Sequence, residues 1–159
     1  MADIRNTDDI IDSRDVIERL EELTDERDAL QDDADEAAEA AHAAVNDDEP
    51  QDVIVRLADE AIRLAELVAA YDRSEKGAEL AALQAFADVA EGYASDWRHG
   101  ATLVRESYFP DYCRDMLEEC GDLPRDLPSY VVIDWSATAD NLRVDYTEVD
   151  FDGVTYLVR

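Results

Sequence analysis

The chain has 159 residues, and its hydrophobic fraction of 47% is enough apolar material for the core of one folded domain. Its 42 acidic side chains outnumber 14 basic ones and give a formal net charge of −28 at pH 7. So strong a negative charge repels nucleic acid and anionic membrane surfaces, and it excludes both as direct partners.

The start of the chain and its cysteines bear on the cellular compartment. MADIRNTDDI contains neither the basic nor the apolar region of a signal peptide, and no window approaches the length of a membrane-spanning helix. Cys113 and Cys120 are seven residues apart in a segment expected to be helical, which places them about 10 Å apart, too far for a disulfide. We expect a soluble cytoplasmic protein with two reduced, partly buried thiols.

A long first helix is predicted from the spacing of apolar residues. Asp12 or Ser13 can cap its start, and apolar residues then recur in alternating steps of three and four over residues 16–44, interrupted only at Arg27. The segment NDDEPQD at 46–52 ends the helix. Its expected length is about 48 Å.

Two further helices are expected between Pro50 and residue 97. Pro50 stands at the first turn of a second helix with an apolar row over residues 54–71, and Gly77 is expected to end it. A third helix is expected over residues 78–97. The apolar rows of the first two helices, joined by a short loop, predict an antiparallel helical hairpin.

The last third lacks the long periodic pattern of the preceding helices. A short extended or irregular stretch precedes a helix from Pro110 to Gly121, and Asp134 can cap a short helix WSATADNL. Asp152-Gly153 lies between TEVDF and VTYLVR and predicts a β-hairpin with a type I′ turn. We expect a mainly helical protein with a small α+β module, divided into residues 1–99 and 100–159.

The sequence contains no signature of an enzyme. A glycine-rich phosphate loop, a G-x-S-x-G segment and a calcium-loop pattern are all missing, so we expect no catalysis and no cofactor. His42 and His99 each follow an acid by three residues, Glu39 and Asp96, as in di-iron helical bundles. Such spacings arise by chance in so acidic a chain, and we expect Glu39 and His42 to face water, so no metal site is predicted.

The first helix has an unusual charge pattern. Residues 1–50 hold 19 acids and four bases, more than half of the net charge. Like charges three or four residues apart destabilise a helix, so these acids do not serve the stability of the helix itself. The rod approaches the charge density of a DNA strand within a factor of about two. A basic DNA-binding groove would attract it by counterion release, which suggests a DNA mimic.

The expected partner-binding carboxylates of the first helix and its tip are Glu18, Glu21, Glu22, Asp25, Glu26, Asp28, Asp32, Asp33, Asp35, Glu36, Glu39, Asp47, Asp48 and Glu49. The same charge is also typical of the surface of a halophilic protein. It would equally confer solubility on a structural protein whose helical hairpin pairs with a partner protein.

The last third also resembles a known family. It contains GATLVRESYFPDYCRDMLEECGDLP, then IDW, then A-x-x-L-x-x-DY, and ends in VDFDGVTYLVR. This pattern resembles the C-terminal domain of ArdA-type antirestriction proteins and of related small acidic phage proteins. The resemblance implies a highly acidic homodimer that mimics DNA and blocks type I restriction-modification enzymes at the site of the methyltransferase core. ArdA proteins begin with mixed α/β domains, whereas this chain begins with a helical hairpin.

The resemblance adds a second set of expected mimic residues, Glu118, Glu119, Asp122, Asp134, Asp140, Asp145 and Asp150. We therefore expect a non-enzymatic inhibitor, encoded by a phage or mobile element, that acts in the cytoplasm of a bacterial host. Its expected partner is the basic DNA-binding groove of a type I restriction-modification enzyme or a CRISPR effector. A homodimer is one way to satisfy the apolar row of the first helix, and the hairpin itself is the other.

Overall fold

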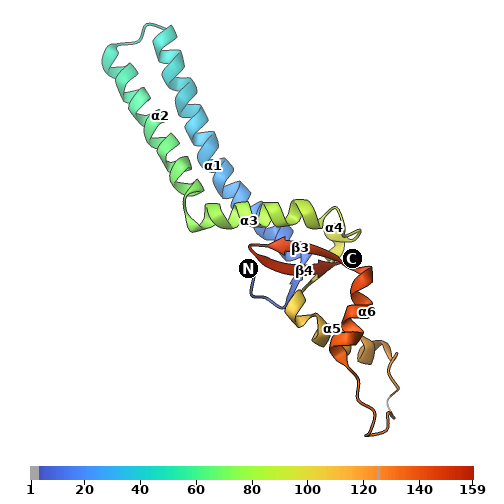
Figure 1. Cartoon of the computed structure of the whole chain (residues 1–159). Helices are drawn as coiled ribbons and strands as arrows, with labels where there is room; N and C mark the ends of the chain where they lie inside the picture. Colours follow the sequence, from blue (N-terminus) through green and yellow to red (C-terminus); the bar gives the residue numbers. More distant parts are fainter. Residues whose placement is uncertain (1–3, 125) are drawn as a thin grey trace. The chain divides into compact units, whose positions relative to one another are not determined.

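The computed structural model describes residues 4–124 and 126–159, which form mostly helices and one four-stranded antiparallel sheet (Figure 1). The helices are α1 (Ser13–Asn46), α2 (Gln51–Asp72), α3 (Glu75–Ala90), α4 (Trp97–Gly100), α5 (Phe109–Cys120) and α6 (Trp135–Leu142), with single 3₁₀ turns η1 (Glu106–Tyr108) and η2 (Arg143–Asp145). The strands are β1 (Ile10–Asp12), β2 (Thr102–Arg105), β3 (Thr147–Phe151) and β4 (Val154–Val158). The predicted fold class, a long helical hairpin followed by short helices and a terminal β-hairpin, is confirmed.

The chain forms two compact units. Leu20–Ala81 is one, here called the hairpin unit, and the residues up to Arg19 together with Ala82–Arg159 are the other, here called the sheet unit. These limits differ from the division expected after residue 99. The physical reason is that β1, near the start of the chain, pairs with β2 in the register Ile11↔Leu103 and so joins the sheet.

The hairpin unit contains the antiparallel pair α1 and α2, as predicted. The hydroxyl of Tyr71 donates a hydrogen bond of 2.9 Å to the carbonyl oxygen of Leu23. Arg27, the residue that interrupts the apolar row, reaches Asp72 of α2 with 2.9 Å between Nε and Oδ1. Lys76 binds both carboxylate oxygens of Glu26, at 2.8 and 2.6 Å. These three contacts hold α1 against the end of α2 and the start of α3.

The predicted boundary between the second and third helices is wrong. α2 ends at Asp72, and Gly77 lies inside α3 instead of ending α2. Ser74 accounts for the difference, because its hydroxyl accepts a hydrogen bond from the backbone N–H of Gly77 and thereby caps the start of α3. Gly77 is buried there, and a Cβ on it would lie 2.4 Å from the carbonyl oxygen of Tyr71.

The third helix also ends earlier than expected, at Ala90 instead of residue 97. Around Ala90 the backbone tightens into 3₁₀-type hydrogen bonds, in which the N–H of Gly92 donates to the carbonyl of Val89 and the N–H of Tyr93 to the carbonyl of Ala90. The sequence around Gly92 has low helix propensity, which is why the helix does not continue. Tyr93, which lies beyond the end of α3, is exposed.

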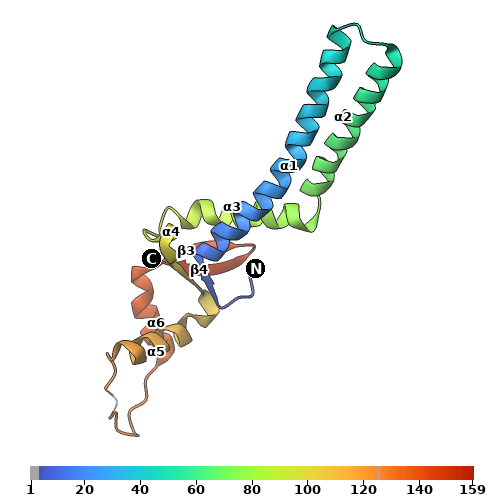
Figure 2. The ribbon, with the colours of Figure 1, turned by 180° about the vertical axis from the view of Figure 1, so that it is seen from behind.

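The sheet unit has the strand order β1-β2-β4-β3, with every pair antiparallel. Alternate residues of β4 point to opposite faces. On one face Tyr156 contacts Phe86 of α3, with ring centroids 5.9 Å apart. On the other, Leu157 packs with Phe109 and Cys113 of α5. Helices therefore cover both faces of the sheet, and Figure 2 shows them from behind.

Several local predictions for the sheet unit are confirmed. Asp134 caps α6 by accepting a hydrogen bond from Ala137, and Gly121 ends α5 in a left-handed conformation with φ of 76°. The β3–β4 turn has positive φ at Asp152 and Gly153, as a type I′ turn requires. The two cysteines are free but differ from the expectation, since only one of them is buried and Cys120 is exposed.

Ser13 links the start of α1 to the segment before β2. Its side chain is fully buried, and its hydroxyl donates to the carbonyl oxygen of Trp97 at 2.6 Å and accepts from the N–H of Ala101 at 2.7 Å. No helix in the described ranges is both long and apolar enough to span a membrane.

Candidate protein-binding surface

Acidic side chains form a regular row along α1 within the hairpin unit. We call this row the acidic stripe; it consists of Glu21, Asp25, Asp28, Asp32, Asp35 and Glu39. These residues recur in alternating steps of four and three, which places them on one face of a helix. All six are exposed, and at about 100° per residue they lie opposite the buried Leu23 and Ala34.

Few cations neutralise the acidic stripe. Arg27 binds Asp72 of α2 and comes only as near as 4.0 Å to Asp28. Asp35 accepts a hydrogen bond of 2.9 Å from the neutral Gln31. Within residues 4–124 and 126–159, Glu21, Asp25, Asp32, Asp35 and Glu39 form no ion pair. The stripe therefore presents an almost uncompensated negative charge.

The charge density of residues 21–39 of α1 is comparable to that of nucleic acid. Residues 21–39 contain ten acids and one base, and they rise about 27 Å along the helix. One net negative charge thus occurs about every 3 Å, against about 3.4 Å per phosphate along one DNA strand. Asp47, Asp48 and Glu49 are all exposed in the loop between α1 and α2 and add to the same charge.

The other expected residues of α1 differ in exposure. Asp33 and Glu36 are exposed, whereas Glu22 and Glu26 are half-buried. Glu26 is also paired with Lys76, an ion pair that the sequence alone did not indicate. Glu18 is exposed but belongs to the sheet unit.

The carboxylates expected from the family resemblance all belong to the sheet unit, and all are exposed. This set is Glu118, Glu119, Asp122, Asp134, Asp140, Asp145 and Asp150. Two of them have a local structural role that accounts for an acid at that position. Asp134 caps α6, and Asp150 accepts a hydrogen bond of 3.1 Å from the N–H of Gly153 in the β-hairpin turn.

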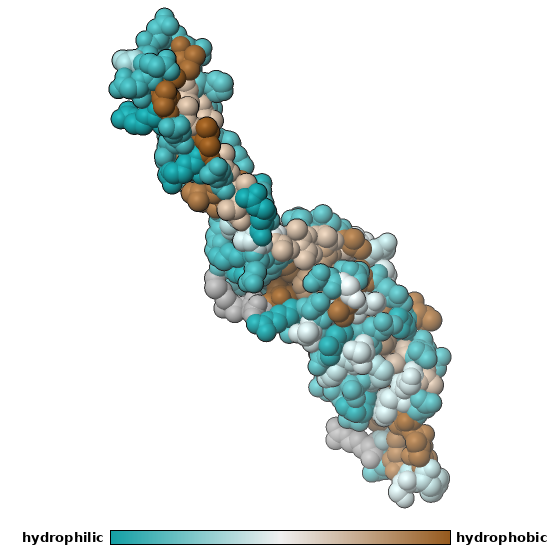
Figure 3. Space-filling model, turned by 60° about the vertical axis from the view of Figure 1, so that its left-hand side comes forward, coloured by the Kyte–Doolittle hydropathy of each residue, from teal (hydrophilic) through white to brown (hydrophobic). Residues whose placement is uncertain are grey.

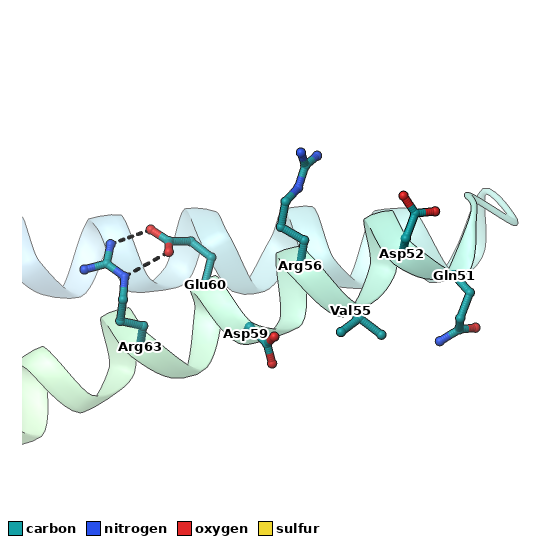
Figure 4. Close-up of a pocket in the computed structure, with 7 residues that line it drawn as sticks. All are labelled: Gln51, Asp52, Val55, Arg56, Asp59, Glu60 and Arg63. Atoms are coloured by element: carbon teal, nitrogen blue, oxygen red, sulfur yellow. Dashed lines mark hydrogen bonds and ion pairs between the residues drawn. The ribbon is translucent and has the colours of Figure 1, made fainter.

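The surface of α2 has a shallow depression near the loop, lined by Gln51, Asp52, Val55, Arg56, Asp59, Glu60 and Arg63 (Figure 4). All seven residues come from one helix, so the depression has no opposite wall to enclose a small molecule. Arg63 donates two hydrogen bonds to Glu60, and this contact lowers the pKa of the Glu60 carboxyl. Val55 is 47% exposed on this surface.

Side chains that could bind a metal ion do not cluster in the described ranges. No cluster of three or more histidine, cysteine or acidic side chains there is arranged to hold a metal ion. His42 and Glu39 are both exposed, as expected from their place beside the apolar row. Burial raises the pKa of the Cys113 thiol, which disfavours the reactive thiolate.

No family model matches the chain, and comparisons with curated proteins and with solved structures found none that is similar. The resemblance of residues 100–159 to ArdA-type proteins therefore stays a prediction.

Proposed function

We propose that this protein is a non-enzymatic DNA mimic that occupies the DNA-binding groove of a bacterial defence enzyme. The observation that carries the proposal is the acidic stripe, six exposed carboxylates at helical spacing that have a single ion pair, Arg27 with Asp28 at 4.0 Å, among the described residues. The family resemblance of residues 100–159 favours a type I restriction-modification enzyme as the target. A CRISPR effector, whose basic channel holds nucleic acid, is the other target class.

The physical basis is the same as for DNA binding. A polyanion releases the cations condensed around it when the lysines and arginines of a basic groove neutralise its charges, and this gain in free energy does not require that the anionic groups be phosphates. Carboxylates spaced like phosphates supply this attraction and steer the two proteins together rapidly at low salt. The acids of α1 repel one another within the helix, a cost that a partner's cations would remove.

Charge-neutral variants test the proposal. One variant replaces Asp25, Asp28, Asp32, Asp33, Asp35 and Glu36 by the corresponding amides. A matched control replaces six exposed acids elsewhere, Asp52, Asp59, Glu66, Glu75, Asp88 and Asp96, and changes the net charge equally. Both are measured for competition with duplex DNA on a type I restriction enzyme and on a CRISPR effector.

We expect the first variant to lose inhibition by at least tenfold while its circular dichroism stays unchanged, and the control to retain inhibition. Equal inhibition by the first variant and the wild-type chain would exclude the α1 face as the binding surface. Equal loss in both variants would assign the effect to total charge instead of to the stripe.

A second candidate function is supported by the incomplete burial of the hairpin. Most apolar residues that face the opposite helix are only half-buried, among them Leu30, Leu57 and Leu64. This favours an interaction protein whose hairpin pairs with a partner helix. Salt distinguishes the two functions, since a mimic loses affinity steeply as salt rises and an apolar pairing does not.

A further inference from the structure

A groove of about 430 Å³ lies between α1 and α2 on the hairpin unit. Its apolar lining consists of Ala37 and Ala40 from α1 and Leu57 and Leu64 from α2. Its remaining lining residues are charged, namely Asp33, Glu36, Glu60 and Arg63. The groove therefore combines an apolar surface with charged borders within one compact unit.

The described part of the chain covers this apolar lining only incompletely. Ala37, Leu57 and Leu64 are half-buried and Ala40 is exposed. On the face that Figure 3 shows, apolar residues likewise run along the hairpin between hydrophilic ones. The buried apolar side chains among the hairpin unit's described residues are Leu23, Ala34, Ala44 and Val68. Because alanine is small, the α1 wall leaves room for side chains of another helix to approach closely.

The charge of the borders decides which helix fits. Asp33 and Glu36, on the α1 side, form no ion pair within the described ranges, whereas Glu60, on the α2 side, is paired with Arg63. The hairpin unit as a whole carries 20 acids and five bases, a net charge of −15. A second copy of the chain would bring the same negative charge to the groove and be repelled. A cationic helix would be attracted.

We propose that this groove binds an amphipathic helix of the inhibited protein, apolar on one face and rich in lysine or arginine along the flank that meets α1. The inference rests on the proposed function and adds the kind of element that the target presents. Burial of the helix's apolar face supplies an attraction that salt does not screen, and it selects among basic proteins that charge alone would not distinguish.

The test uses the full chain and a designed peptide of about 21 residues, six turns of helix. The peptide carries leucine and alanine at heptad spacing with lysine on the flanks, and a scrambled peptide has the same composition without the spacing. Binding is measured by calorimetry at about 0.3 M NaCl, where exposed ion pairs are largely screened. We expect the patterned peptide to bind at least tenfold more tightly and to become helical by circular dichroism.

Variants of the chain locate the binding. Ala37→Gln and Ala40→Gln fill the groove without removing any packing side chain, and each is expected to weaken the patterned peptide at least fivefold. Ala38→Gln is the matched control, because Ala38 is exposed on α1 and does not line the groove. Its expected affinity is unchanged.

Three results would overturn the inference. These are equal binding of the scrambled peptide, unchanged binding by the Ala40→Gln chain, or a dimer of the wild-type chain that Ala40→Gln dissociates, which would make a second copy the occupant. The outcome is separable from the proposed function, because the alanine variants keep every carboxylate of the acidic stripe. If the peptide test fails while the amide variant still loses inhibition, the groove inference is refuted and the DNA-mimic proposal stands.

Discussion

Replacing Ser13 by alanine tests the contact, within the sheet unit, between the start of α1 and the segment before β2. The Ser13 hydroxyl is fully buried and makes two short hydrogen bonds, to the carbonyl of Trp97 at 2.6 Å and from the N–H of Ala101 at 2.7 Å. Alanine leaves both backbone groups without that partner in a site closed to water. Each such unsatisfied buried group costs about 1–3 kcal/mol, so we expect a loss of about 2–4 kcal/mol.

The measurement is urea unfolding followed by tryptophan fluorescence. Both tryptophans, Trp97 and Trp135, belong to the sheet unit, so the transition reports that unit. The control is Ser95→Ala, because Ser95 is exposed, and its expected effect is below about 0.5 kcal/mol. A loss of less than about 1 kcal/mol for Ser13→Ala, relative to this control, would refute the reasoning, since it would mean that water or a shifted backbone satisfies the two groups.

Three further predictions concern local features. A Cβ on Gly77 would lie 2.4 Å from a backbone oxygen, so Gly77→Ala should cost about 1–3 kcal/mol in urea unfolding, whereas Gly92→Ala, whose Cβ meets no atom nearer than 3.4 Å, should be neutral or stabilising. Burial raises the pKa of Tyr146 and of Tyr156 to about 12. The stability that this burial provides is full below about pH 10 and should fall between about pH 10 and 12. In a spectrophotometric titration, two of the seven tyrosines should therefore ionise late. Late ionisation of none of them would contradict the burial. Asp134→Ala should destabilise the sheet unit by about 1 kcal/mol through loss of the α6 cap, and Asp134→Asn should not; equal stabilities would show that the cap contributes nothing.

Local signals account for the elements that the sequence predicts well. The bounds of α1, the left-handed glycine after α5, the cap of α6 and the turn between β3 and β4 each depend on a few neighbouring residues. Propensity, capping and turn chemistry act at that range, so the sequence carries the information directly.

Tertiary contacts account for the elements that sequence reasoning missed. β1 has three residues, too few for a periodic pattern, and its partner β2 begins 90 residues later in the chain. The limits of α3 depend on Ser74 and Gly92, single residues that the periodic apolar pattern does not take into account. The hydrogen-bonded role of Ser13 likewise arises only once Trp97 and Ala101 are placed beside it.

The candidate surface also combines features that local sequence predicts with features that depend on tertiary contacts. Exposure of the acidic stripe follows from helical periodicity, because the acids alternate with the apolar row. The pairing of Glu26 with Lys76 and of Arg27 with Asp72 depends on how α1 lies against α2 and α3. The groove lined by Ala40 and Leu57 is formed by both helices, so it is not evident from either helix alone. The sequence feature that indicates it is an apolar row with too few large side chains to be fully buried.

The salt dependence of inhibition tests the DNA-mimic proposal most directly. The wild-type chain and the six-amide variant are each titrated against duplex-DNA binding by a type I restriction enzyme and by a CRISPR effector, from about 50 to 200 mM NaCl, the range over which phosphate-binding proteins lose much of their affinity for DNA. The proposal predicts that inhibition by the wild-type chain falls steeply with salt on a double-logarithmic plot, and that the amide variant is weaker and has a shallower slope. Inhibition that stays constant across this range, or equal slopes for the two chains, would contradict the claim that the carboxylates of α1 stand in for phosphates.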